Sequence, residues 1–514
     1  MNSHAFRTIV IGMMAALSLL VSACDDLSTG LVKRGYSFFI HNPLRWFHPQ
    51  NALTDHINPV DSIDPDTNAT NPRVAFNRKG NAVMVWTQME PIGRVNIYKS
   101  EYRNGRWSHP DKLDEDFLND PGNYNNVSQP TVAVAEDDSY VIAWIQQGNS
   151  NPMNNAFVYA CNNVSCGLIK NYDSPGVIEI TTRETQSVEV AIQNSSKAYV
   201  AVSYWNSSNV YEIRVFEIDI AAMENRGYNV VTENITASDA ALPKIAMDEK
   251  GNSIIVWQQS NGSRQQIYMS VFRGVSWTKP ILSDNINYDS VIFAGAFMPQ
   301  VVMNNYGQAL IAWTQNTASP QYSHIYYSMY NIQNDSLDRP IGAADNRIDT
   351  ADLNENGGTD PQLAIDGSGN AVAVWTNNKR IQMSQYGSNS GTWSEPQYID
   401  PDPGSYSSSN PDVAMNDGGD VVVAWVEYDG SFMRVYKSEY RGESWIHPTD
   451  LADNNIDAEL TSNNNAFEPH VSMANSGQTI IVWHQVYQKI MPDNYHYIYM
   501  SQYRPALEIL PFLY

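Results

Sequence analysis

One short phrase recurs eight times along the chain: an apolar run, a turn, and a second apolar run that ends in tryptophan. The eight tryptophans that end the phrase are Trp86, Trp144, Trp205, Trp257, Trp313, Trp375, Trp425 and Trp483. Their mean spacing is about 57 residues, and a regular period of this order is the signature of a repeat architecture. Most repeated residues are therefore expected to serve the fold, and functional residues are sought among those that do not repeat.

Each repeat reads as four short strands. In the copy at 361–396, strands are predicted at 362–365 and 370–375, with a third at 380–386 and a fourth at 392–396. The turn between the first two strands ends in a glycine suited to a left-handed conformation: Gly80, Gly251, Gly307, Gly369, Gly419 and Gly477. The second strands, such as 254–257 and 421–425, are apolar on both faces and must be covered on both. Blades arranged radially around an axis satisfy that requirement.

One copy of the fourth-strand phrase stands out of order. Residues 45–49 (Arg-Trp-Phe-His-Pro) match 106–110, yet they precede the first repeat, and the last repeat, from Pro469 onward, lacks the phrase. The N-terminal strand is therefore predicted to complete the last blade, which removes exposed strand edges. The prediction is an all-β, eight-bladed β-propeller of four-stranded blades. Seven blades is the alternative, because the copy at 187–205 lacks the turn glycine.

The first residues predict export. Arg7 precedes a short apolar stretch at 9–20, and Val21-Ser22-Ala23-Cys24 resembles the bacterial lipobox, in which the cysteine is acylated. An ordinary signal peptide cleaved near Ala23 is the alternative. The expected domains are a lipoprotein signal peptide at 1–23, a tether at 24–35 and the propeller at 36–514. A lipid-anchored place in the bacterial envelope follows, with the outer membrane or cell surface preferred and the periplasmic side as the alternative.

The other two cysteines agree with an oxidising compartment. Cys161 and Cys166 flank a predicted hairpin turn, so a disulfide is expected, and two free thiols are the alternative. The net charge of −24 argues against nucleic acid as a partner, and against an electrostatic grip on anionic lipid. Membrane contact is therefore expected through the lipid anchor only. The chain is expected to be a monomer.

Two hairpins resemble the Asp-box of sialidase-type propellers. Residues 270–277 and 438–445 keep its serine, glycine and tryptophan, but Phe272 and Tyr440 stand where the aspartate belongs. The resemblance implies a propeller. It also implies a test for catalysis, since that family clamps a carboxylate with three arginines and uses a Tyr–Glu pair and an aspartate. The candidate for the first arginine, Arg45, lies in a repeated structural phrase, because Arg106 holds the same place in the first repeat.

No catalytic set emerges from the other arginines near third-strand starts: Arg94, Arg214, Arg264, Arg380 and Arg434. The chain is therefore expected to be non-enzymatic.

Histidines and acidic loops give no clear metal site. His48, His109 and His447 are copies of one position and are interpreted as structural, whereas His484 and His496 flank one loop and are predicted to meet across it. The acidic loops at 349–356 and 400–404 offer oxygen atoms for calcium, although neither matches a calcium-loop spacing. No cofactor is expected, and calcium in these loops is the alternative.

The longest connections are predicted to lie on one face of the propeller, where loops on a rigid scaffold commonly bind ligands. They cover 55–71, 114–129, 284–298, 344–360, 452–468 and 486–495. The predicted ligand-binding residues are polar side chains two residues after the repeat tryptophans, with three nearby aromatics: Gln88, Gln146, Gln259, Gln315, Asn377, Glu427, Gln485, Tyr322, Phe432 and Tyr487. The alternative is that the polar side chains only satisfy strand ends and each other.

Together these features predict a lipid-anchored, non-enzymatic, adhesin-like propeller that binds a glycan or protein of the envelope or its surroundings. Two alternatives stay open. One is a divergent sialidase-type glycoside hydrolase, and the other is a scaffold for protein assembly in the envelope.

Overall fold

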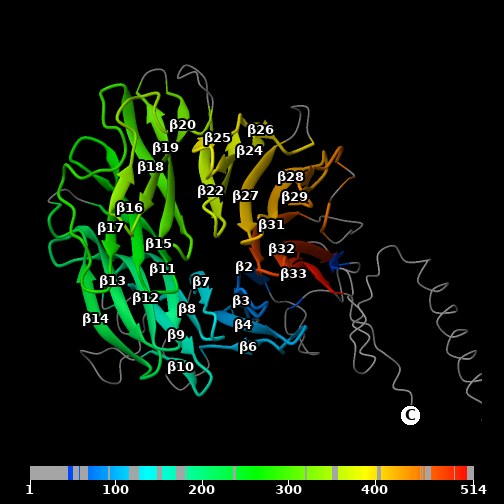
Figure 1. Cartoon of the computed structure of the whole chain (residues 1–514). Helices are drawn as coiled ribbons and strands as arrows, with labels where there is room; N and C mark the ends of the chain where they lie inside the picture. Colours follow the sequence, from blue (N-terminus) through cyan, green and yellow to red (C-terminus); the bar gives the residue numbers. More distant parts are fainter. Residues whose placement is uncertain are drawn as a thin grey trace, which may run out of the picture. The chain divides into compact units, whose positions relative to one another are not determined.

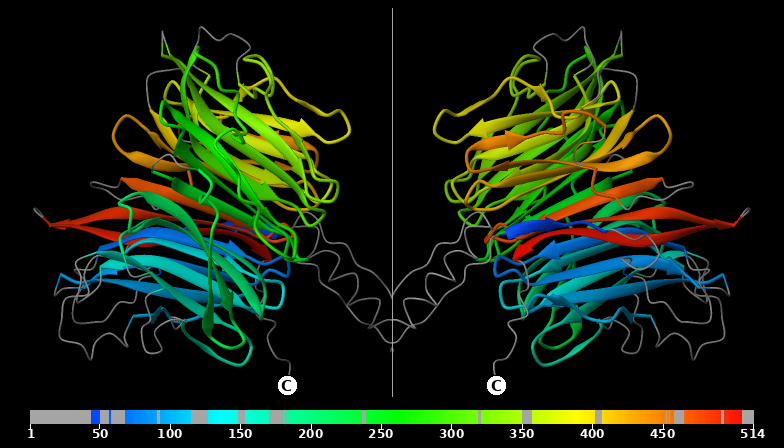
Figure 2. Two further views of the ribbon diagram at one scale, coloured as in Figure 1. Left: turned by 90° about the vertical axis from the view of Figure 1, so that its left-hand side faces the viewer. Right: turned by 90° about the vertical axis from the view of Figure 1, so that its right-hand side faces the viewer.

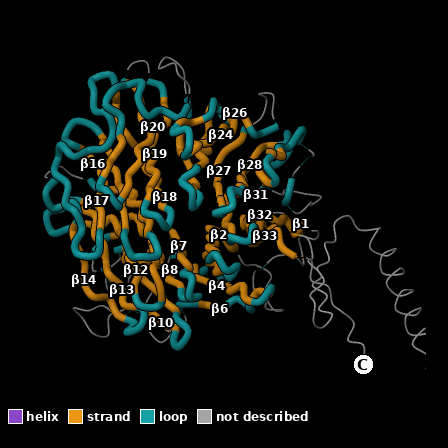
Figure 3. Tube along the Cα trace, viewed as in Figure 1, coloured by secondary structure: helices purple, strands orange, loops and turns teal. Residues whose placement is uncertain are grey.

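A computed structural model describes most of the chain. The described residues are 44–49, 57, 68–90, 93–114, 127–147, 153–169, 180–181, 183–235, 239–318, 321–349, 357–401, 407–451, 453, 455–457, 465–490 and 493–505. Cys24, the lipobox and much of the long predicted loops lie outside them. Strands and loops make up this part of the chain, and it contains no helix (Figure 3). Accordingly, no helix there is long and apolar enough to cross a membrane.

In the described part of the chain, the strands form eight antiparallel sheets, as the repeat predicts. The first strand of each sheet is β2 (Asn68–Phe76), β7 (Ser128–Val134), β11 (Thr185–Asn194), β15 (Ala241–Met247), β18 (Phe293–Met303), β22 (Thr359–Ile365), β27 (Ser408–Met415) and β31 (Ala466–Met473). The second is β3 (Ala82–Met89), β8 (Tyr140–Gln147), β12 (Lys197–Trp205), β16 (Ser253–Ser260), β19 (Gln308–Thr317), β23 (Ala371–Asn377), β28 (Val421–Tyr428) and β32 (Thr479–Ile490).

The outer half of each sheet is less regular. The third strands are β4 (Val95–Arg103), β9 (Asn154–Cys161), β13 (Tyr211–Asp219), β17 (Gln265–Phe272), β20 (Ser323–Asn331), β24 (Arg380–Gly387), β29 (Met433–Arg441) and β33 (Asp493–Pro505). The short outer strands are β5 (Arg106–Trp107), β6 (Asp111–Lys112), β10 (Cys166–Leu168), β14 (Glu224–Val230), β21 (Ser336–Asp338), β25 (Thr392–Trp393), β26 (Gln397–Tyr398), β30 (Ser444–Ile446) and β1 (Leu44–Phe47). In the fourth sheet a single bridge, Phe272 to Trp277, takes the place of the outer strand.

The sheets stand radially around a common axis (Figure 1), and the side views show their twist (Figure 2). Each first strand contacts the first strands of both neighbouring sheets, and β31 contacts β2, so the ring is closed at its inner wall. The eight-bladed propeller is therefore confirmed, and the seven-bladed alternative is wrong. The copy at 187–205 forms a blade of its own through β11 and β12.

That third blade departs from the repeat in one respect. Glu189 pairs with Ala201, whereas the corresponding residue of the second blade, Thr131, pairs with Ala143 directly before Trp144. Val202 thus occupies the place of the repeat tryptophan, and Trp205 lies three residues further on, half-buried. The other seven repeat tryptophans are fully buried and fill the space between blades.

The chain divides into two compact units, His48–Ser501 and a small one made of Met1–Phe47 with Gln502–Tyr514. In the small unit, β1 pairs antiparallel with the end of β33, from Leu44 opposite Pro505 to Phe47 opposite Gln502. The strand order of the eighth sheet is β1-β33-β32-β31, so the N-terminal strand supplies its fourth strand as predicted.

Two further predictions about local structure are confirmed. A disulfide joins Cys161 and Cys166, which lie opposite each other across the turn between β9 and β10. The predicted turn glycines have positive φ, for example +92° at Gly80. In the degenerate Asp-box, the Phe272 and Trp277 rings pack 5.6 Å apart, as do Tyr440 and Trp445 at 5.5 Å. Aromatic packing thus occupies the place of the missing aspartate.

Candidate binding site in the central channel

The polar residues predicted to bind a ligand lie inside the blades. Gln88, Gln146, Gln259, Gln315, Asn377, Glu427 and Gln485 are all at least nine-tenths buried. Six of them accept a hydrogen bond from the repeat tryptophan two residues earlier, such as Trp144 Nε1 to Gln146 Oε1 at 2.9 Å. In the sixth blade, Trp375 Nε1 donates instead to the Gly357 carbonyl at 2.8 Å and to Gln382. These contacts fit the alternative interpretation, in which the polar side chains satisfy groups within the blades. The prediction that they bind a ligand is untested.

The three predicted aromatics are dispersed. The Tyr322 backbone N–H donates a 2.8 Å hydrogen bond to the Thr317 hydroxyl, and the Phe432 ring lies 5.6 Å from the Arg434 guanidinium. The Tyr487 side chain lies outside the described residues.

The arginines near third-strand starts are held within their own blades. Arg94 lies 4.0 Å from Asp114, Arg380 lies 3.0 Å from Asp400, and Arg434 Nη1 lies 3.1 Å from Asp457. Burial raises the pKa of Asp114 to about 6 and that of Asp457 to about 7, against the pull of the neighbouring cations. The remaining two pair similarly, Arg214 with Glu212 and Arg264 with Asp289.

His484 and His496 meet as predicted, with ring centroids 5.3 Å apart. Within the described residues, however, no group of three His, Cys, Asp or Glu side chains is placed to hold a metal ion. Asp349 and Asp400, which begin the two acidic loops, accept hydrogen bonds from the Ile325 backbone and from Ser408, and the rest of both loops lies largely outside the described residues. Calcium binding is therefore untested.

The first strands surround a cavity, here called the channel, and a set of polar side chains missed by the sequence prediction lies on these strands. Each blade contributes one residue from its first strand, and these eight are here called the channel belt: Arg73, Thr131, Glu189, Lys244, Gln300, Gln362, Asp412 and His470. The belt residues of blades one to four and eight line a cavity of about 300 Å³.

A local backbone feature positions the belt. In seven blades a proline directly precedes the belt residue, and the residue before that proline has positive φ, from 50° to 55°. The pairing between first and second strands shifts at the same point, for example between Thr70 and Arg73. Such bulges bend a strand and redirect side chains. The repeated X-Pro-polar pattern was therefore the sequence signal for this site.

The charges of the belt are closely coupled. Lys244 forms an ion pair with Glu189, which also accepts a 3.5 Å hydrogen bond from Thr131. His470 Nε2 lies 3.7 Å from Asp412, and their side chains are 32% and 20% exposed, so both remain accessible from the channel. Burial lowers the pKa of His470, whose Nδ1 has no hydrogen-bond partner among the described residues. The His470 imidazole thus belongs to a belt that also holds two cationic side chains, Arg73 and Lys244, and two carboxylates, Glu189 and Asp412.

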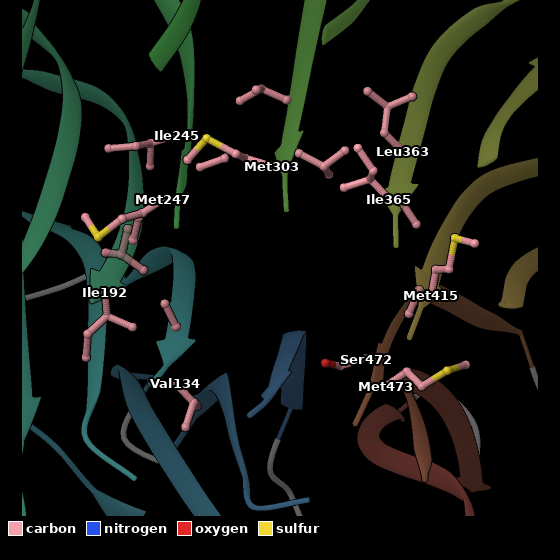
Figure 4. A pocket seen from close by; sticks show the side chains of 18 of the residues that line it. Val134, Ile192, Ile245, Met247, Met303, Leu363, Ile365, Met415, Ser472 and Met473 are labelled. Carbon is pink, nitrogen blue, oxygen red and sulfur yellow. The ribbon is translucent and has the colours of Figure 1, made fainter. Parts of the chain in front are cut away.

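Further along the same strands, the channel wall becomes apolar. Valine, isoleucine and methionine side chains converge around a cavity of about 470 Å³, here called the apolar chamber (Figure 4). The residues nearest the strand ends are Val134, Ile192, Met247, Met303, Ile365, Met415 and Met473. All first strands run in the same direction, so the belt lies toward the face where they begin and the chamber toward the face where they end.

The turns that follow the first strands bond to one another beyond the chamber. They form what is here called the turn ring: Arg78, Glu136, Glu249, Asn305, Asp417 and Asn475. Arg78 Nη1 lies 3.1 Å from Asp417 of the seventh blade and 3.5 Å from Glu249 of the fourth. A side chain of the first blade therefore reaches across this end of the channel to the opposite wall.

Comparisons with known proteins add little beyond the fold. No protein-family model matches the chain, and no curated protein matches it. A polysaccharide lyase structure is similar with a TM-score of 0.45 at 10% identity, covering 80% of this chain and 98% of that one. The β-propeller domain of the Trilobed protease from Pyrococcus furiosus has a TM-score of 0.40 at 9% identity, with 77% and 99% covered. A Hadza microbial sialidase has a TM-score of 0.36 at 10% identity, with 70% and 63% covered. The function is therefore argued from the geometry.

Proposed function

We propose that the protein is a non-enzymatic binding propeller whose ligand is a glycan that enters the channel and bonds to the channel belt. The observation that carries this proposal is the belt itself, five of whose polar side chains line one cavity: Arg73, Thr131, Glu189, Lys244 and His470. Such polar groups are costly to bury without partners, so a site that gathers them suits a ligand that bonds to them. Sugar hydroxyls suit the belt because each can both donate and accept a hydrogen bond.

The charge pattern favours a largely neutral ligand. Arg73 and Lys244 are balanced by Glu189 and Asp412, and the lowered pKa of His470 keeps that ring uncharged near neutrality. A highly charged polymer would meet groups of its own sign on part of the belt. A neutral polyhydroxylated chain end avoids this repulsion.

Binding of the soluble domain to a glycan array, followed by titration calorimetry, tests the proposal. The double variant Lys244→Met with Glu189→Gln removes the ion pair in the belt, and it is expected to weaken binding at least tenfold. Lys279→Met is the matched control, because Lys279 pairs with Glu233 at an exposed outer position. Equal binding by both variants, or no binding to any glycan, would contradict the proposal.

A divergent glycoside hydrolase is a second candidate, favoured by the carboxylates around the belt. Burial and the nearby Asp412 raise the pKa of Asp360, which directly precedes the proline of the sixth blade. Glycoside hydrolysis uses a pair of carboxyl groups, one of which has a raised pKa. The unaltered protein and Asp360→Asn would be assayed on a panel of glycosides. Hydrolysis by the unaltered protein that is lost in Asp360→Asn would favour this candidate over binding without catalysis.

We further propose that Cys24 anchors the protein in the bacterial envelope by an acyl chain, with the outer membrane or cell surface preferred. The support is the lipobox sequence alone. Metabolic labelling with a palmitate analogue is expected to mark the native protein and not Cys24→Ser. Removal by protease added to whole cells would place the protein on the cell surface. Protection from that protease would instead favour the periplasmic side and an assembly scaffold.

A further inference from the structure

The channel changes character over a short distance. On β15, for example, Lys244 belongs to the belt and Met247, three residues later, lines the apolar chamber. At ~3.3 Å per residue the two levels are ~10 Å apart along the strand. The same change from polar to apolar occurs on β7, β11 and β31, which line both cavities. The two cavities therefore form successive levels of one channel.

The chamber has the properties of a site for apolar groups. Its side-chain lining is aliphatic or methionine almost throughout, with Ser472 as the polar exception. Ser472 is itself occupied, because its hydroxyl accepts a hydrogen bond of 3.0 Å from the Phe76 backbone. Methionine adapts its shape to varied apolar partners, and four methionines contribute here. The apolar side chains offer contacts to an apolar occupant, and backbone N–H and C=O groups also reach the cavity between them.

The far end of the chamber is obstructed. The turn ring lies directly after the chamber residues, since Asp248 and Glu249 follow Met247 and Asn416 and Asp417 follow Met415. Arg78 bridges Glu249 and Asp417 across this end. A ligand that entered past the belt would thus have a limited depth available to it.

We infer that the channel binds an amphiphilic glycoconjugate, with its sugar at the channel belt and its single apolar tail in the apolar chamber. This inference rests on the proposed function and names the ligand class of the same site. Polar groups at the belt complement the hydroxyls, and the chamber complements the tail. A tail of ~10 Å would reach from the belt to the last chamber residues, such as Met247, and the turn ring begins beyond them.

A series of alkyl glycosides tests the inference by titration calorimetry. The probes are alkyl β-glucosides, β-galactosides and β-mannosides with tails from methyl to decyl, each used below its micelle concentration. For the head group that binds, affinity is expected to rise by up to about fourfold per buried methylene. The rise is expected to stop once the tail exceeds ~10 Å, where it passes the last chamber residues and reaches polar groups of the turns. A series with no dependence on tail length would overturn the inference.

Variants separate the tail site from the head site. Met303→Glu places a charge in the chamber and is expected to abolish the dependence on tail length, while the methyl glycoside binds as before. Ile446→Glu is the control, because the Ile446 side chain is 51% exposed on the outer strand β30. Met303→Leu keeps an apolar wall and is expected to keep the dependence. Circular dichroism and thermal melting check that each variant is folded.

The outcomes also separate this inference from the proposed function. Binding of the methyl glycoside without any gain from longer tails leaves the glycan site in place and removes the tail site. Binding of long tails that ignores the sugar and survives loss of Lys244 and Glu189 contradicts both the glycan proposal and the inference. The inference is also overturned if a folded Met303→Glu variant still binds glycosides with an affinity that rises with tail length.

Discussion

At the scale of single residues, the repeated side chains hold the blades together. Gln315 illustrates this role, because its Oε1 accepts a 3.0 Å bond from Trp313 and its Nε2 donates a 2.8 Å bond to the Tyr288 carbonyl. The sequence shows that an amide lies two residues after six of the eight repeat tryptophans, but it does not show which way the amide turns. The side chain direction depends on the indole N–H, which needs a partner once the tryptophan is buried. For this reason, polarity in the sequence alone could not distinguish residues that bind a ligand from residues that bond the buried tryptophans.

Gln315→Leu is predicted to destabilise the protein by ~1–3 kcal/mol, since it leaves the buried indole N–H and the Tyr288 carbonyl without their partner. Chemical denaturation measures the change. Gln333→Leu, at an exposed turn position, is the control and should change stability by less than ~0.5 kcal/mol. Equal effects at the two sites would contradict a structural role for the amide.

His484 gives the protein a predictable response to acid. Burial and the adjacent His496 lower its pKa to about 3, whereas an unfolded histidine titrates near ~6.5. Between these values the unfolded chain binds more protons, so stability should fall as pH decreases from ~6.5 toward 3. His484→Phe, which keeps the packing on Phe467, should make this fall shallower in denaturant unfolding at several pH values. His109→Phe, at an exposed position, should leave the pH dependence unchanged.

At the scale of elements, the sequence predicted the strands and tight turns well and the bulges poorly. The turn glycines and the apolar second strands have local signatures that a single repeat reveals. The bulge before each belt residue has a weaker one, because proline disfavours helix in the preceding residue without specifying positive φ. Only the pairing with the second strand shows that Arg73 and its counterparts are offset toward the channel.

The bulge in the fourth blade carries conformational strain that can be relieved. Leu242 has a φ of +52°, a region that costs most residues ~1–2 kcal/mol and that asparagine tolerates better. Asn71 and Asn410 occupy the same position in other blades. Leu242→Asn is therefore predicted to stabilise the protein by up to ~1 kcal/mol in chemical denaturation. Leu242→Ala retains a Cβ atom and should give no such gain; a gain in both variants would point to another cause.

At the scale of the whole molecule, the ring of blades was predictable and the channel inside it was not. Repeat number and order follow from the spacing of the tryptophan phrases and from the misplaced phrase at 45–49. The channel wall combines short stretches of residues from distant segments of the chain. Their alignment depends on how the blades pack, so the belt and the chamber become visible only when the ring is assembled.

Arg78→Ala is predicted to open the obstructed end of the channel at small cost in stability, because exposed ion pairs contribute only ~0–1 kcal/mol. Oxidation of individual methionines by peroxide, followed by mass spectrometry, measures the opening. Met247 and Met303 should oxidise faster than in the unaltered protein, with Met298 unchanged as an exposed reference. Lys79→Ala, in the same turn, is the control. Unchanged oxidation rates in Arg78→Ala would show that this side chain does not limit access.

The pairing of β1 with the end of β33 has a consequence for biosynthesis. Residues 44–47 emerge early from the ribosome, yet their partners at 502–505 are among the last to be made. The early segment must therefore wait, unpaired, while all the intervening repeats are synthesised. Maturation of this sheet is thus expected to begin only after the chain is nearly complete, and a chain released early would leave its leading strand available to other molecules.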